Sequence, residues 1–212
     1  MRLSRFVFAL ALGAALLAPA TADAQRRSST RPAQTAAVTV PAGTYALDPA
    51  HTNFNFSVQH MGLAEVTGAF AQTSGTITVG SGGLRTFEAT ATAQTASINT
   101  RVDMRDNHLK SADFFDAANH PTVTFQSTGV RNVRGNRFQL LGTLTMRGVS
   151  RPIVLDAQYR GTAMQPAQMG GKRLVGFSAR GTVNRLDYGI SYGPDMIGQT
   201  VQIVINAEAV QQ

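Results

Sequence analysis

The stretch TNFNFSVQH, residues 52–60, alternates polar and apolar side chains along its length. Phe54, Phe56 and Val58 fall on one face of an extended chain, and asparagine, serine and glutamine fall on the other. Successive side chains of a β-strand point to opposite faces, so the pattern predicts a strand with one buried face. The same period of two recurs through most of the chain from Tyr45 onward.

About eight segments share this alternation, and polar or glycine-rich turns separate them, such as GSGG at 80–83 and NVRGN at 132–136. Antiparallel strands that each carry one apolar face build sandwiches or closed barrels. The strands here are long and regular, and eight strands make a barrel wide enough to hold one ligand. We therefore predict an all-β fold, an antiparallel β-barrel of about eight strands.

One segment departs from this period and predicts a single helical insertion near residues 101–116. Asn99-Thr100 are suitable N-cap residues in front of it. Asp103 and Asp106 fall in or near the first turn, where the helix dipole favours negative charge. Pro121 indicates the return to extended chain.

The N-terminus has the pattern of a secretory signal peptide. An apolar run of thirteen residues, Phe6–Ala18, follows a basic start and precedes an A-x-A cleavage pattern at Ala22–Ala24. We assign residues 1–24 to a cleaved signal peptide, 25–39 to a flexible leader poor in apolar residues, and 40–212 to the barrel domain. This organisation predicts an exported, periplasmic protein.

Composition excludes several classes of protein. Five of the 19 basic and one of the 12 acidic residues lie before residue 40, which leaves a net charge of +3 on the remainder. The basic residues are scattered singly among few aromatics, which does not favour nucleic-acid binding. No second apolar segment reaches membrane length. The absence of cysteine excludes a disulfide framework.

The histidines and carboxylates near residues 105–125 do not have the spacing of a metal or catalytic site. His108 has Ala112 four residues on, not a second ligand, and His120 lies twelve residues away. The chain has no cysteine nucleophile and no G-x-S-x-G elbow. Asp113 and Asp116 can share a helix face, as exposed carboxylates at a helix end commonly do. We expect no cofactor, no metal and no enzymatic activity.

The chain resembles the YceI-like proteins, a family of lipocalin-like barrels that bind polyisoprenoids. The block R-x-x-H-L-x-S-x-D-F-F and the T-x-R-G-V block are distinctive, and the resemblance covers nearly the whole barrel domain in order. One departure is that relatives commonly carry a tryptophan where this chain has Tyr192 and no tryptophan. The matching segments are YALDPAHTNFNFSVQHMG (45–62), FAQTSGTI (70–77), SINTRVDMRDNHLKSADFFDAANHPTVTFQST (97–128), LLGTLTMRGVSRPIVLD (140–156), GFSARGTVNRLDYGIS (176–191) and the C-terminal VQIVINAEAV.

The resemblance implies an exported protein that sequesters or carries a long polyisoprenoid, a quinone or a prenyl phosphate, in the barrel lumen. It implies an isoprenoid lipid as the partner; a homodimer is possible from any exposed strand edge. Small residues across Phe87–Ile98 leave space inside, which suits a ligand channel. A barrel filled by its own side chains is the alternative. The residues predicted to line the lumen are Phe54, Phe56, Phe125, Phe138, Leu155, Phe177, Val183, Tyr192 and Ile203.

Four polar residues are candidates for binding the lipid head group: His51, Arg105, His108 and Arg185. Each can donate a hydrogen bond to a quinone carbonyl or a phosphate. Three of them also have an ordinary structural role open to them: His51 in a turn, Arg105 in a pair with Asp113 or Asp116, and Arg185 in a pair with Asp187. Phe114-Phe115 is expected to pack the helix on the barrel rim.

Two other functions stay open from the sequence. One is an enzyme acting on isoprenoid or ester substrates, with His51 or His108 as the base. The other is a stress-response interaction scaffold whose barrel holds no ligand.

Overall fold

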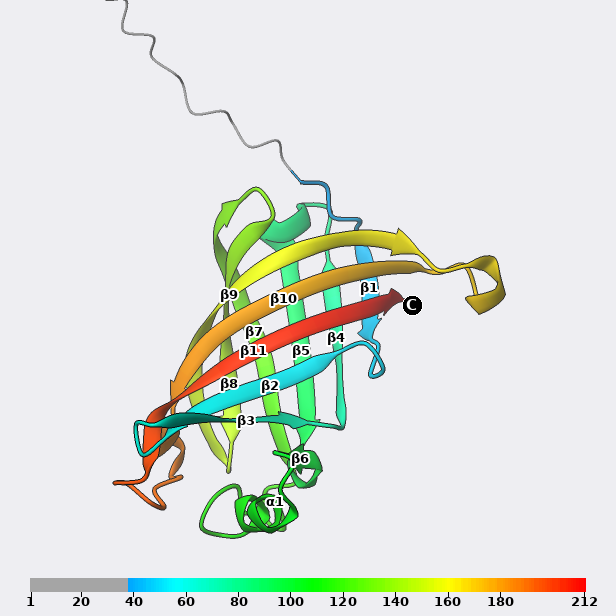
Figure 1. Cartoon of the computed structure of the whole chain (residues 1–212). Helices are drawn as coiled ribbons and strands as arrows, with labels where there is room; N and C mark the ends of the chain where they lie inside the picture. Colours follow the sequence, from blue (N-terminus) through cyan, green and yellow to red (C-terminus); the bar gives the residue numbers. More distant parts are fainter. Residues whose placement is uncertain (1–37) are drawn as a thin grey trace, which may run out of the picture. The chain divides into compact units, whose positions relative to one another are not determined.

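The computed structural model describes residues 38–212, which all belong to one compact unit (Figure 1). The predicted signal peptide and most of the predicted leader fall on residues 1–37 and lie outside the described residues. The described chain forms one eleven-stranded sheet, one α-helix and four short 3₁₀ helices. The strands are β1 (Gly43–Leu47), β2 (Asn53–His60), β3 (Ala64–Phe70), β4 (Thr73–Val79), β5 (Phe87–Gln94), β6 (Ile98–Asn99), β7 (Thr122–Arg134), β8 (Arg137–Met146), β9 (Val149–Met164), β10 (Arg173–Asn184) and β11 (Ile197–Gln211). The helices are α1 (Asp103–Lys110), η1 (Gly83–Thr86), η2 (Thr95–Ser97), η3 (Ala167–Met169) and η4 (Arg185–Tyr188).

The sheet closes on itself, which confirms the predicted barrel. Strands β1, β4, β5, β7, β8, β9, β10 and β11 pair in that order, and β1 also pairs with β11, so eight strands form a ring. All the strand pairs are antiparallel. A closed ring leaves no free edge, which satisfies the backbone hydrogen bonds of every member strand.

The two ends of the barrel have different strands in their walls, because one edge of β11 pairs with two strands in succession. Residues 209–211 of β11 pair with β1, whereas residues 197–206 pair with β2. Strand β2 then pairs with β3, and β3 pairs with the short strand β6. The end that carries α1 therefore has β2 and β3 in its wall, and the opposite end has β1 there (Figure 1).

The period of two seen in the sequence separates the inner and outer faces. In β8, every second residue from Phe138 to Met146 is buried, including Leu140, Gly142 and Leu144, while the residues between them are only half-buried. Their inward faces meet those of β9, where Ile153 and Leu155 are buried. The alternation therefore predicted these strands and their orientation correctly.

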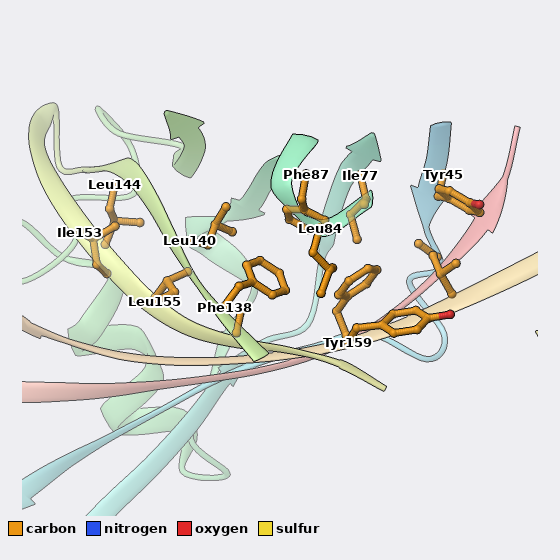
Figure 2. Packing of buried hydrophobic residues seen from close by; sticks show 14 of the residues in the cluster. Tyr45, Ile77, Leu84, Phe87, Phe138, Leu140, Leu144, Ile153, Leu155 and Tyr159 are labelled. Carbon is orange, nitrogen blue, oxygen red and sulfur yellow. The ribbon is translucent and has the colours of Figure 1, made fainter. Parts of the chain in front are cut away.

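A packed aromatic cluster fills the barrel end opposite α1 (Figure 2). The ring centroid of Phe87 lies 5.1 Å from that of Phe138 and 4.9 Å from that of Phe177. Tyr159 packs on Phe177 at 5.3 Å. Tilted aromatic pairs at these distances add to the stabilisation from burial alone. This half of the barrel is a conventional hydrophobic core.

The helical insertion is present but shorter than the predicted 101–116. Helix α1 begins at Asp103, and its N-cap is Val102, which makes no side-chain cap hydrogen bond. The expected cap residue Thr100 instead bonds the side chain of Asp106. The chain from 111 to 120 forms hydrogen-bonded turns, and β7 begins directly after Pro121. Among residues 38–212, no helix has the length and apolar character needed to cross a membrane.

Candidate functional site

The α1 end of the barrel encloses a cavity of about 700 Å³. Its walls are formed by residues of β2, β3, β5, β7, β8, β10 and β11, and α1 and the turns after it contribute to its rim. Most of the lining is aliphatic or aromatic. Such a volume lies within the range of natural small-molecule sites. Of the predicted lumen residues, the cavity is lined by Phe54, Phe56, Phe125, Val183, Tyr192 and Ile203.

The cavity exists because small residues face inward at this level. Ala91 and Ala93 of β5 line it, as the sequence indicated for this strand. Gly68 and Gly142 act differently, because a Cβ on either would collide with an aromatic ring, that of Phe56 or Phe125. The two rings therefore lie against the wall over a glycine, and the lumen beside them stays open.

Three predicted lumen residues lie elsewhere. Phe138, Leu155 and Phe177 are buried in the packed end and line only a separate space of about 70 Å³. The lumen is thus half hollow and half filled. The sequence left open whether the lumen is a ligand channel or a packed core. The structure has both, the channel at the α1 end and the packed core at the opposite end. Four residues line both spaces and so form the partition between them: Phe54, Ala91, Phe125 and Ile205.

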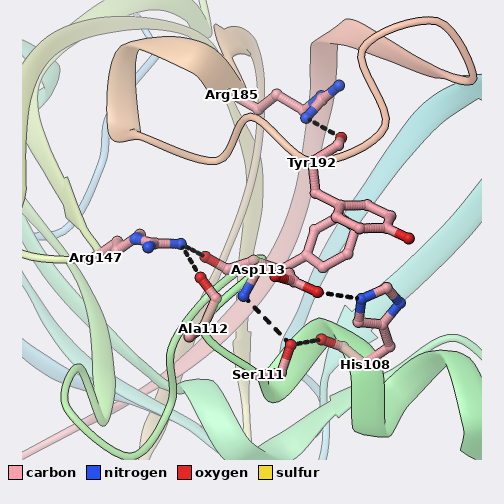
Figure 3. A network of polar contacts seen from close by, with 8 residues as sticks. His108, Ser111, Ala112, Asp113, Arg147, Arg185 and Tyr192 are labelled. Carbon is pink, nitrogen blue, oxygen red and sulfur yellow. Dashed lines mark hydrogen bonds and ion pairs between the residues drawn. The ribbon is translucent and has the colours of Figure 1, made fainter.

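A short lid made of α1 and the turns up to residue 120 covers the rim. Phe114 is buried and Phe115 stacks edge-on against Phe70 of β3 at 5.7 Å, and both also line the cavity. Arg147, in the turn between β8 and β9, donates to the backbone carbonyls of Ala112 and Phe114 (Figure 3). The Phe-Phe pair therefore packs the rim as predicted and forms part of the wall.

Arg105 lies half-buried on the cavity wall. Its Nε donates to Thr100 Oγ1 at 2.7 Å, and its Nη2 donates to the Thr100 carbonyl at 2.8 Å. The side chain of Asp106 accepts from the backbone N–H of Thr100, so one threonine links the arginine and the aspartate. Arg105 does not pair with Asp113 or Asp116. Its third nitrogen, Nη1, has no hydrogen bond within residues 38–212 and can donate to a ligand.

His108 lines the cavity on the lid side. Its Nε2 lies 2.8 Å from Asp113 Oδ2, and its ring packs edge-on against Tyr192 at 4.7 Å (Figure 3). A histidine held by a carboxylate can work as a base, but the nearby Ser111 hydroxyl donates to the His108 backbone carbonyl, not to the ring. The arrangement orients the imidazole toward the mouth without supplying a nucleophile.

Arg185 is buried, and all of its nitrogens bind backbone carbonyls. Nε donates to Gly198, Nη1 donates to Ile190 and Tyr192, and Nη2 donates to Ile197, all within 3.0 Å. It does not pair with Asp187. Desolvation lowers the pKa of its guanidinium. Although it borders the cavity, four of its five N–H donors bind backbone carbonyls between Ile190 and Gly198 and so hold the loop that carries Tyr192. Its main contribution to ligand binding is therefore indirect.

His51 lies in the turn between β1 and β2 and is not among the residues that line the cavity. Its Nδ1 is 2.8 Å from Asp48 Oδ2 and 3.8 Å from Glu208 Oε1. The hydrogen bond that His51 donates to Asp48 raises the pKa of His51 and lowers the pKa of Asp48. These three groups could hold a metal ion. Their contacts are also those of an ordinary hydrogen-bonded turn.

Several lining residues were not identified from the sequence. Met104 of α1 and Met196 of the loop before β11 lie at the mouth, and His60 and Gln59 end β2 beside them. Nothing in the local pattern marks these residues, because they come together only when the lid meets the β2 end of the barrel. The ion pairs found among residues 38–212 all involve histidine, so neither Arg105 nor Arg185 is directly paired with a carboxylate.

Comparison with known proteins agrees with this architecture. The profile of the YceI-like domain matches residues 45–209. Protein YceI of Escherichia coli O6:H1 is 36% identical over 162 residues, which are 76% of this chain and 83% of that protein. BcnA of Burkholderia cenocepacia superposes with a TM-score of 0.67 at 20% identity, covering 77% of this chain and 99% of that one. A polyisoprenoid binding domain from Saccharophagus degradans, implicated in plant cell wall breakdown, superposes with a TM-score of 0.60 at 20% identity, covering 79% and 98%.

Proposed function

This chain belongs to the YceI-like family, and on that premise we propose that it binds a long-chain polyisoprenoid in the hollow half of its barrel. The observation that carries the proposal is the cavity of about 700 Å³, which is lined mostly by apolar side chains and has Arg105 and His108 on its lid side. The domain from Saccharophagus degradans that shares the fold is a polyisoprenoid binding domain, which supports the same class of ligand.

The energetics of the cavity favour such a ligand. Burial of hydrocarbon contributes roughly 0.8 kcal/mol per CH₂, so two isoprene units in the lumen contribute about 5 kcal/mol or more before entropy losses. A chain that is nearly insoluble in water gains most from this transfer. The branched methyl groups of an isoprenoid fit between inward alanines and the two rings of Phe56 and Phe125.

The head group of the lipid is proposed to lie at the mouth beside Arg105 and His108. Arg105 has one nitrogen that no residue from 38 to 212 binds, and His108 is oriented by Asp113. Both suit an oxygen acceptor, whether a quinone carbonyl or a phosphate. Arg185 supports the site through the loop it holds, and His51 has no part in it.

Filling the lumen tests this assignment. Ala91→Phe places a ring in the cavity, whereas Thr90→Phe adds the same ring on the exposed outer face of the same strand. Protein purified from its own host is extracted with organic solvent, and the extract is analysed by mass spectrometry. Because the added ring takes up only part of a cavity of about 700 Å³, Ala91→Phe is expected to carry less prenyl lipid than the wild type and Thr90→Phe. Equal lipid content in folded Ala91→Phe, or an empty wild type, would overturn the proposal.

We also propose that the protein is exported and acts in the periplasm as a carrier or store. The support is the signal-peptide pattern of residues 1–24. N-terminal sequencing of the protein from a periplasmic fraction is expected to begin at Gln25. Recovery of the full-length chain from the cytoplasm would contradict export.

A further inference from the structure

Exposed apolar side chains gather at the mouth of the barrel. Among the large hydrophobic residues that are exposed in the described part of the chain, most lie on three segments around the cavity opening. Leu63 and Met104 are the most exposed of them, at 86% and 82%. We name this set the apolar rim; it consists of Met61, Leu63, Val102, Met104, Tyr192 and Met196.

The three segments that carry the apolar rim contact one another. They are the turn between β2 and β3, the start of α1, and the loop before β11. The backbone N–H of Met61 donates to the carbonyl of Met196 at 2.7 Å, which joins the first and third segments. Tyr192 contacts His108 of α1, which joins the second and third. Met104, Tyr192 and Met196 also line the cavity, so the rim continues into its wall.

We propose that the apolar rim is a membrane-docking surface that inserts into the interface of a lipid bilayer. The proposal rests on the proposed function in one respect, namely that the cargo of the cavity is a lipid of the membrane. Apolar side chains that gather on a solvent-exposed surface are typical of interaction sites. What identifies the occupant is the cavity that opens at the centre of the rim.

The path of the cargo favours a bilayer over a protein partner. A prenyl chain that leaves the cavity passes Met104 and Met196 first. In water, each exposed CH₂ lowers the probability of that passage about fourfold. If the rim lies among lipid head groups and upper acyl chains, the hydrocarbon moves from one apolar environment to another and is never wetted. Flexible methionine and leucine side chains adapt to such a fluid surface.

The charge of the rim indicates how it binds. Its three segments carry His60, Arg101, Asp103 and Asp195, so neither sign dominates. Anionic lipid is therefore not required, and binding is expected to come from shallow insertion of apolar side chains. It follows that high salt should leave the binding largely intact, because screening weakens only electrostatic attraction.

Flotation with vesicles of phosphatidylcholine tests the proposal. Wild-type protein is expected to float with the vesicles at low and at high salt. Leu63→Glu and Met104→Glu should each lower the bound fraction about tenfold, since each removes one inserted side chain and adds a charge. Met169→Glu is the matched control, because Met169 is 66% exposed in the connection between β9 and β10, away from the cavity. Its binding should equal that of the wild type.

Lipid content, measured on the same preparations, separates this proposal from the proposed function. Leu63 is not among the residues that line the cavity, so Leu63→Glu is expected to keep its extractable lipid while losing vesicle binding. The docking proposal is overturned if the wild type does not float, or if Leu63→Glu floats as well as Met169→Glu. It is also overturned if the rim variants abolish a dimer of the wild type without changing flotation. If the wild type yields no extractable lipid but its flotation still depends on the rim residues, only the proposed function is overturned.

Discussion

Removing the ring of Phe54 is expected to lengthen the hydrocarbon chain that the barrel accepts. Phe54 and Phe125 are the largest side chains in the partition between the cavity and the small space beyond it. Phe125 is held against Gly142, so Phe54 is the simpler of the two rings to remove. Phe54→Ala should join the two spaces into one longer lumen.

The size of the effect follows from the volumes. A cavity of about 700 Å³ holds about 23 carbon atoms at roughly 30 Å³ each, the liquid volume of a water-sized group, which is between four and five isoprene units. The substitution adds the small space of about 70 Å³. It also frees the volume of six ring carbons, roughly 180 Å³ on the same scale. The gain is about eight carbons, or between one and two isoprene units.

Native mass spectrometry can measure this shift. Delipidated protein is equilibrated with an equimolar series of prenols of graded length, and the length distribution of the bound prenol is read from the complex. Phe54→Ala should move the maximum to longer prenols at a stability cost of no more than about 3 kcal/mol, since Phe54 is only half-buried. Phe56→Ala widens the cavity away from the partition and should not lengthen the bound chain. Identical distributions for wild type and Phe54→Ala would refute the partition.

Three further predictions concern the groups that shape the site. Arg185→Ala should lower the free energy of unfolding in urea by about 3–5 kcal/mol, because four carbonyls lose a charged donor; a loss below about 1 kcal/mol would contradict this role. The His51–Asp48 contact should stabilise the fold below the unperturbed His pKa of 6.5 and be lost as pH rises through the raised pKa of His51. The Tm difference between wild type and His51→Gln is thus expected to be largest below pH 6.5 and to disappear above the raised pKa of His51, and a constant difference would disprove the linkage. Gly142→Ala should cost about 1–3 kcal/mol and push the Phe125 ring into the lumen in a crystal structure. Gly129→Ala, where a Cβ meets no neighbour, should be near neutral and is the control.

The sequence predicted the barrel well because alternation is a local property. A strand such as β8 shows its inner face in its own residues, and turns such as 80–83 and 132–136 are marked by glycine and polar residues. The helical insertion was predicted at the correct place, but the predicted helix was longer than α1. Its second half forms turns held by Arg147, which lies more than thirty positions on in the chain, and no local pattern contains that contact.

The division of the interior could not be predicted from alternation. Phe56 lines open space and Phe138 lies in packed core, although both sit at inward positions of regular strands. The difference depends on what stands opposite on the neighbouring strands, such as Gly68 beside Phe56. Arg185 illustrates the same limit, because the sequence shows a charge near Asp187 whereas the fold offers it four carbonyls. His51 is the contrasting case: its turn with Asp48 lies within four residues and was foreseen as an alternative.

The aromatic cluster of Phe87, Phe138, Phe177 and Tyr159 has a consequence for how this barrel can change. Because the packed aromatic cluster lies at the end opposite α1, the residues that line the cavity contribute less to the stability of the fold. Substitutions of the cavity-lining residues should change which ligand is bound without unfolding the protein. Natural or engineered substitutions can therefore change ligand selectivity at the α1 end while the packed end keeps the fold stable.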